Sequence, residues 1–185
     1  MMRRPVQKIN DVERVITDPE RSRERTMNRA VKLLAAKPRS VGELRERLLE
    51  KNWTNAGIVD RVLDKLKEYS YLDDTKFASD LALSKLRQKP QGKRRLQQSL
   101  SQKKLSKEDV QTAIASAFER MPETELIDVA IAKRLRLKGK PETRDDTKKF
   151  YDHLMRQGFD FDLTRSKMAE VAKRDVIDEE IGESY

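Results

Sequence analysis

Three stretches of this sequence share one spacing of apolar residues: LRERLLEKNWTNAGIVDRV (residues 44–62), LQQSLSQKKLSKEDVQTAI (residues 96–114) and FYDHLMRQGFDFDLTRSKM (residues 150–168). In the first two, the apolar residues follow one another at steps of 4, 5, 5 and 4. The third keeps this spacing as far as Phe159 and then places Leu163 one position early. The copies are offset by 52 and 54 residues. A pattern that recurs at a period of about fifty residues indicates an internal repeat, here present three times.

Each copy of the repeat reads as three short helices. The four-residue steps place apolar side chains on one helical face, and the five-residue steps straddle a break between helices. In the first copy we expect a helix over residues 26–37, a capping box formed by Ser40 and Glu43, and Thr54 as the cap of the third helix. The helices expected in the other copies span residues 74–88, 93–103 and 107–120, and then 123–137, 144–157 and 161–174.

The repeat determines the predicted fold class and domains. A single copy cannot bury its apolar stripe alone, so neighbouring copies must share cores. The predicted fold is therefore all-α, an elongated tandem array of three three-helix repeats over residues 26–72, 73–121 and 122–177. Residues 1–25 lack the periodicity and are expected to form a mobile N-terminal segment, and residues 178–185 form an acidic tail. Trp53 shares its repeat position with Leu105 and Phe159, which favours a core role over base stacking.

Composition excludes several classes of function. The chain has no Cys and only one His, so thiolate sites, disulfides and histidine metal clusters are excluded. No phosphate-binding loop or nucleophile elbow is present, and the paired carboxylates precede expected helices, where capping explains them. We therefore expect no enzyme activity, no cofactor and no bound metal. No apolar run approaches the length of a membrane span, so no membrane association and a cytoplasmic location are expected.

The net charge of +9 indicates a polyanionic partner, and the second repeat carries a basic stretch without acids. The window from Leu81 to Lys107 contains nine basic residues and no Asp or Glu. Three of these cations, residues 93–95, fall in the first turn of an expected helix, where the helix dipole disfavours positive charge by ~0.3–1 kcal/mol. A phosphate bound at that helix start would explain them, and a solvated basic face is the alternative. The runs at residues 133–138 and 148–149 extend the basic character into the third repeat.

Three segments resemble the RecX family, regulators of the RecA recombinase. Ser40-x-x-Glu-Leu-Arg-x-x-Leu48 is similar to the SxxELRxxL segment of that family, and Tyr71-Leu-Asp-Asp-Thr-Lys-Phe-Ala78 resembles its YLDDxRFA segment. Residues 92–105 are similar to its GPxRIRxEL…KGI stretch. The resemblance spans roughly residues 27–175. Departures include Lys93, where the family has Pro, and Pro90, where Gly is common.

The resemblance implies a function that residue chemistry alone does not. RecX-like proteins bind the RecA filament on single-stranded DNA, lie along its groove, restrain ATP hydrolysis, strand exchange and coprotease action, and limit filament extension. We expect a monomer that contacts single-stranded DNA directly or through RecA. The alternative is a stand-alone helical DNA-binding protein or transcription factor. The residues predicted to contact RecA or DNA are Lys85, Arg87, Lys89, Lys93, Arg94, Arg95, Lys103 and Lys104, with Arg39, Arg45, Lys148 and Lys149 as further candidates.

Overall fold

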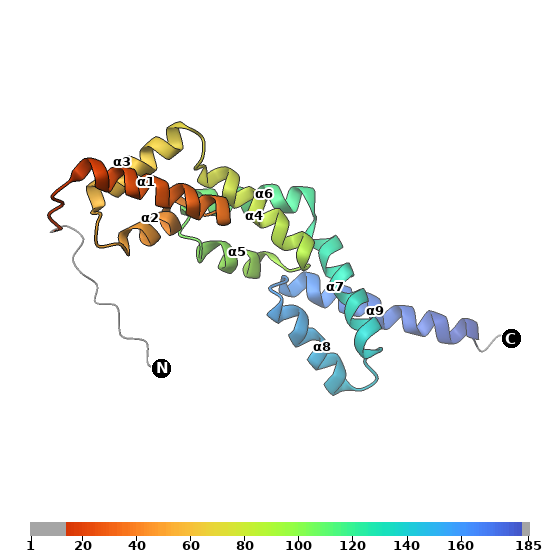
Figure 1. Ribbon diagram of the computed structural model, residues 1–185. Coiled ribbons are helices and arrows are strands. Elements are labelled where there is room, and N and C mark those ends of the chain that lie inside the picture. The colour runs from red at the N-terminus through yellow and green to blue at the C-terminus, as the bar shows by residue number, and fades with distance from the viewer. Residues whose placement is uncertain (1–13, 183–185) are drawn as a thin grey trace, which may run out of the picture. The chain divides into compact units, whose positions relative to one another are not determined.

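The computed structural model describes residues 14–182, with side chains through Val171, and these residues form nine α-helices and no strand (Figure 1). The helical fold class predicted from the sequence is confirmed. The helices are α1 (Pro19–Ala36), α2 (Val41–Leu49), α3 (Ala56–Glu68), α4 (Asp74–Gln88), α5 (Lys93–Ser101), α6 (Lys107–Arg120), α7 (Glu123–Lys138), α8 (Arg144–Arg156) and α9 (Phe161–Gly182). None of the helices within this described range is long and apolar enough to cross a membrane.

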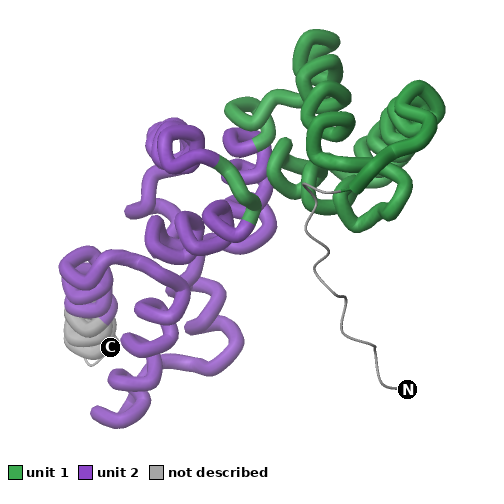
Figure 2. The backbone as a smooth tube through the Cα atoms, turned by 90° about the vertical axis from the view of Figure 1, so that its left-hand side faces the viewer, with its two compact units in different colours: residues 1–77, 103–105 green, residues 78–102, 106–185 purple. Residues whose placement is uncertain are grey.

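The described residues divide into two compact units, coloured separately in Figure 2. Unit 1 contains residues 14–77 and 103–105, and unit 2 contains residues 78–102 and 106–182. In unit 1, helices α1, α2 and α3 pack against one another (Figure 1). In unit 2, α5 packs on α6, and α7, α8 and α9 contact each other. Short amphipathic helices bury their apolar faces only in such groups, because none is stable alone in water.

The repeat positions form the core of unit 1 as expected, with one exception. Leu44, Leu48 and Val62 are at most 1% exposed and belong to one apolar cluster with residues of α1 and α3. Trp53, expected in the core, is only half-buried. The Arg25 guanidinium lies 4.4 Å from the centre of its ring. The Trp53 side chain is therefore partly exposed, and the Arg25 guanidinium stacks on the face of its indole ring in a cation–π contact.

Helix caps explain several polar residues at the helix starts. The Ser40 hydroxyl accepts the N–H of Glu43 at 3.1 Å, as the capping box predicted. The expectation for Thr54 is wrong, because Asn55 caps α3 by accepting the N–H of Ile58 at 3.0 Å. Thr54 is instead 1% exposed, and its hydroxyl lies 3.0 Å from that of Thr26. A buried hydroxyl needs such a partner, so Thr54 serves the core and not the cap.

The third copy of the repeat keeps the register of the first two through a polar residue. Phe150, Leu154 and Phe159 are at most 2% exposed. At the next position Leu163 is half-buried, while Thr164 is fully buried. The Thr164 hydroxyl donates to the Asp160 carbonyl at 2.7 Å, which satisfies the buried oxygen. The early Leu163 is thus a neighbour of the core position, and Thr164 occupies it.

Two helices extend beyond the segments expected from apolar spacing. Helix α1 begins at Pro19, seven residues before the expected start, because Asp18 accepts the N–H of Arg21 at 3.0 Å and Pro19 takes the first helical position. Helix α9 continues to Gly182, and the expected end was residue 174. The mobile segment and acidic tail predicted at the two ends fall largely on residues 1–13 and on side chains after residue 171, which lie outside the described residues.

Candidate functional site

Two junctions of the same design hold the second helix of the first two repeats. Val41, the first residue of α2, donates its N–H to the Asp74 carboxylate at 2.8 Å. Lys93, the first residue of α5, donates its N–H to the Glu123 carboxylate at 3.1 Å. Asp74 and Glu123 are themselves the first residues of α4 and α7. The acid that opens the first helix of one repeat therefore caps the second helix of the repeat before it.

Backbone carbonyls complete both junctions. The Ser40 hydroxyl, immediately before α2, donates to the Lys103 carbonyl. The Gly92 N–H, immediately before α5, donates to the Gln157 carbonyl at 3.0 Å. The step from residue 40 to 92 is 52 residues and that from 103 to 157 is 54, the spacing of the repeat. All contacts of the first junction lie within unit 1 and all those of the second within unit 2.

The second junction brings two glycine backbones into direct contact. A Cβ on Gly92 would lie 2.1 Å from the Gly158 carbonyl oxygen, so no larger residue fits there. Gly158 has φ +85°, in the left-handed region, and its own Cβ would lie 2.5 Å from the Arg95 nitrogen. The N–H of Arg94 reaches the Gly158 carbonyl at 3.3 Å. The start of α5 is therefore fixed against the turn between α8 and α9.

This geometry corrects the phosphate hypothesis for the start of α5. The backbone donors of Gly92, Lys93 and Arg94 are taken by the Gln157 carbonyl, the Glu123 carboxylate and the Gly158 carbonyl. The Glu123 carboxylate supplies the negative charge that the helix dipole favours at this end. The basic window contains no acidic residue in the sequence, but the fold places the Glu123 carboxylate beside it. Any anion at this place would have to bind the side chains of the cations alone.

Five of the twelve predicted contact residues are used within the fold. The ion pairs are Arg45 with Asp60 at 2.7 Å, Lys103 with Glu43 at 2.9 Å, Lys104 with Glu46 at 2.8 Å, and Lys149 with Asp145 at 2.6 Å. The most enclosed of these is Lys103–Glu43, whose side chains are 24% and 19% exposed. The Glu43 carboxylate, expected to reach back to the Ser40 N–H, accepts from Lys103 instead. The Arg95 guanidinium donates to the Arg156 carbonyl at 3.0 Å.

The remaining predicted residues present their cations differently. Arg87, Lys89, Lys93, Arg94 and Lys148 are exposed, and none of these side chains pairs with a carboxylate among the described residues. Lys85 and Arg39 are half-buried. Four of the five exposed cations lie between the last turn of α4 and the first turn of α5. These four residues, Arg87, Lys89, Lys93 and Arg94, are called the basic patch, and together with Lys148 they are the predicted residues that the fold leaves exposed to a partner.

In α8, unlike in the basic patch, a predicted cation has acidic neighbours on its own helix. A hydrogen bond to Asp145 raises the pKa of Lys149, and the nearby charge of the same carboxylate acts in the same direction. The Thr143 hydroxyl donates to Asp146 at 2.7 Å and lowers the pKa of that carboxyl, assisted by Lys149. Lys149 is therefore balanced by the acids of its own first turn. Of the predicted pair in this helix, only Lys148 is available.

Comparison with known proteins assigns the chain to a family. The model of the first three-helix domain of RecX matches residues 27–66, and that of the second matches residues 73–114. The regulatory protein RecX of Prosthecochloris aestuarii (strain DSM 271 / SK 413) is 30% identical over 147 residues, which cover 80% of this chain and 93% of the relative. The chain belongs to the RecX family. RecX of Chlorobium limicola (strain DSM 245 / NBRC 103803 / 6330) is 33% identical over 137 residues, covering 74% of this chain and 82% of the relative.

Solved structures of RecX proteins share the fold. The crystal structure of RecX from Lactobacillus salivarius superposes with a TM-score of 0.72 at 16% identity, over 83% of this chain and 98% of that one. A second structure, of a regulatory protein RecX, gives a TM-score of 0.68 at 22% identity, over 78% of this chain and 72% of that one. The motif residues that resemble the RecX family have structural roles in this chain: Ser40 and Asp74 both lie in the first junction, and Gly92 lies in the second.

Proposed function

We propose that this RecX-family protein binds the RecA filament on single-stranded DNA and inhibits its ATPase, recombinase and coprotease activities, by occupying the filament groove or limiting filament extension. The observation that carries the proposal is membership of a family whose relatives are named regulatory proteins. Occupation of a groove needs no catalytic group, which agrees with a surface of cations and the absence of any nucleophile or metal motif from the sequence.

The basic patch is the proposed contact with acidic RecA surface or DNA phosphate. Its four cations come from α4, α5 and their connection, and the second junction holds the backbone of Lys93 and Arg94. A rigid backbone reduces the entropy lost when long side chains bind a partner. Lys103, Lys104, Arg45 and Lys149 contribute less, because a partner would first have to break an existing ion pair.

The test of regulation is steady-state ATP hydrolysis by RecA on single-stranded DNA, titrated with this protein at physiological salt. Inhibition well below one molecule per RecA protomer supports capping or groove occupation. No inhibition at excess protein refutes the proposal and favours the alternative, a stand-alone helical DNA-binding protein, which predicts binding to duplex DNA without RecA.

The test of the patch is the double variant Lys93→Ala/Arg94→Ala. Arg95 is kept, since its guanidinium bonds to the Arg156 carbonyl. We expect weaker filament binding and a smaller salt dependence, because the slope of log affinity against log salt scales with the number of phosphates or acids neutralised. Lys32→Ala/Lys37→Ala in and after α1 removes the same charge from exposed positions and serves as the control. Equal loss in both variants would mean that net charge matters and the patch does not.

A further inference from the structure

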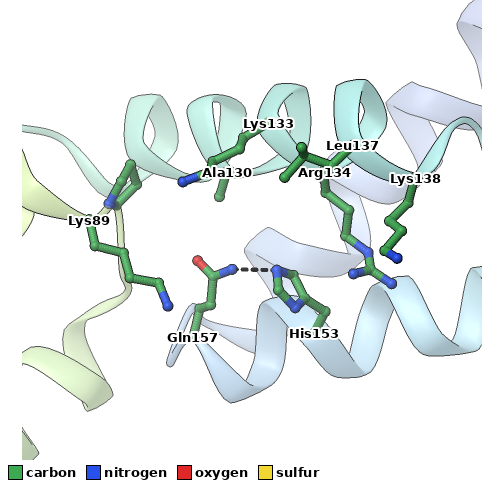
Figure 3. Close-up of a pocket in the computed structure, with 9 residues that line it drawn as sticks. Lys89, Ala130, Lys133, Arg134, Leu137, Lys138, His153 and Gln157 are labelled. Carbon is green, nitrogen blue, oxygen red and sulfur yellow. Dashed lines mark hydrogen bonds between the residues drawn. The ribbon is translucent and has the colours of Figure 1, made fainter.

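A pocket of about 300 Å³ opens in unit 2 between α7, the C-terminal half of α8 and the connection after α4 (Figure 3). Lys133, Arg134 and Lys138 of α7 border it on one side. Lys89, from the connection, borders it as well. Four cations, three from α7 and one from the connection after α4, thus line one hollow, and no carboxylate occurs among the described residues that line it. Such a charge distribution concentrates anions.

The polar floor of the pocket is formed by His153 and Gln157, which lie one turn apart on α8 and its end. Figure 3 shows both side chains directed into the space between α7 and α8, with Nε2 of Gln157 2.6 Å from Nε2 of His153. With the amide nitrogen donating, the ring nitrogen must accept, which requires a neutral imidazole. Burial lowers the pKa of His153, and the charges of Arg134, Arg156 and Lys89 lower it further. The surroundings of His153 therefore favour the uncharged form of its ring.

The cations differ in how firmly they are placed. The Arg134 guanidinium lies 5.2 Å from the centre of the Phe150 ring, which is 2% exposed, so a cation–π contact holds it over the core. Lys89, Lys133 and Lys138 are exposed and can turn toward a ligand. A guanidinium in a fixed place with mobile ammonium groups around it suits an anion with several acceptor oxygens.

The pocket also has an apolar side, made by Pro90, Ala130 and Leu137. Leu137 is 63% exposed, so its side chain is accessible to a ligand in the pocket. The volume lies at the lower end of small-ligand sites, which combine apolar walls with a few polar anchors. We propose that this pocket binds one nucleotide unit, with its phosphate on the four cations and its base or sugar against the apolar side.

The nucleotide unit could come from a free nucleoside monophosphate or from a single strand of DNA. A phosphate suits the site better than the carboxylate of an acidic protein, because it offers more acceptor oxygens and up to two negative charges to four cations. The inference deepens the direct-contact form of the proposed function. It is tested without RecA, so its failure leaves regulation of the filament untouched, and a failed ATPase assay leaves the pocket untouched.

The chain contains a single His, which makes the pocket directly observable. In the full chain without added histidine, the imidazole proton signals in a ¹H NMR spectrum belong to His153 alone. The probes are thymidine monophosphate, a short oligothymidylate, inorganic phosphate and an oligoglutamate, each titrated near pH 7 at ~0.15 M salt. We expect the two thymidine probes to shift the His153 signals with saturation, and to raise the pKa of His153 in a pH titration, because a bound anion favours the charged ring.

The decisive variant is Lys133→Gln/Lys138→Gln, which removes two exposed cations from α7 and leaves the packed Arg134 in place. We expect its affinity for either thymidine probe to fall about tenfold or more, because charge-assisted contacts are lost. The control is Arg120→Gln/Arg165→Gln, which removes two exposed cations of unit 2 that do not line the pocket. Its affinity should stay within about twofold, the scale of an exposed, screened charge.

Each outcome of these titrations supports or overturns a part of the proposal. Stronger binding of the oligothymidylate than of the monophosphate supports a strand as the source, and the reverse supports the free nucleotide. Equal shifts with inorganic phosphate and with thymidine monophosphate would overturn the apolar half of the site. Equal affinity for oligoglutamate would replace the nucleotide with an acidic protein segment. Absence of any shift, or equal affinity of the pocket variant and wild type, would overturn the proposal.

Discussion

Replacing Gly92 with Ala should destabilise unit 2, although alanine is normally the better residue. Gly92 has φ −79° and ψ 170°, a conformation that alanine adopts freely, so the substitution causes no backbone strain at residue 92 itself. The obstacle is the neighbouring backbone, because the added Cβ would lie 2.1 Å from the Gly158 carbonyl oxygen. Neither group is the end of a flexible side chain, so the two segments must separate.

The size of the effect follows from what that separation breaks. Overpacking costs about 1–3 kcal/mol. The bonds from Gly92 N–H to the Gln157 carbonyl and from Arg94 N–H to the Gly158 carbonyl would be stretched or lost, at about 0.5–1.5 kcal/mol each. The lower entropy of an unfolded chain with Ala returns about 0.4–1 kcal/mol. The net loss in free energy of unfolding is about 1–6 kcal/mol.

Urea unfolding followed by far-UV circular dichroism measures this loss, and Gly57→Ala is the matched control. Gly57 lies in the first turn of α3, and its added Cβ would meet nothing closer than 3.8 Å. The same exchange should there stabilise the protein by about 0.4–1 kcal/mol. Both variants replace glycine with alanine, but the expected changes in the free energy of unfolding have opposite signs. A Gly92→Ala midpoint at or above that of wild type would refute the close backbone contact of the second junction.

Three further predictions concern single polar side chains. Asp73→Ala should lower the free energy of unfolding by ~1 kcal/mol, because Asp73 accepts the N–H of Lys76 at 2.8 Å at the start of α4; no change in the urea midpoint would argue against a capping role. Thr54→Val should cost about 0.5–1.5 kcal/mol by removing the hydroxyl that faces Thr26, and the fluorescence of the neighbouring Trp53 would report the shifted transition. Below pH 6.5, the usual pKa of histidine, the unfolded chain binds a proton that His153 in the folded chain resists. Stability should therefore fall as the pH drops from neutral toward 5, by less in a His153→Gln variant; parallel curves for the two proteins would contradict a lowered pKa.

The sequence by itself determined the helices, the family and the repeated core. Apolar side chains at steps of four and five residues can share one face only on short helices, and Leu44, Leu48, Leu96 and Leu100 are all at most 1% exposed. The same local rules located the Ser40 cap, since capping involves residues three apart in the chain. Apolar spacing does not predict the Asp18 cap of α1, because no apolar stripe begins there.

Only the tertiary structure decided which charges remain available. Lys103 and Lys104 belong to one acid-free window of the sequence, yet their carboxylate partners Glu43 and Glu46 lie 60 and 58 residues earlier in the chain, in α2. Glu123 neutralises the start of α5 from α7, and its offset from Asp74 is 49 residues, five fewer than that between Leu96 and Phe150, so repeat spacing does not align the two acids. Likewise, Lys89 and Arg134 border one pocket although they lie 45 residues apart in the chain. Apolar periodicity is a property of neighbouring residues along one helix, so the sequence predicts the core. Charges interact through space with residues far away in the chain, so only the tertiary structure shows which cations remain available to a partner.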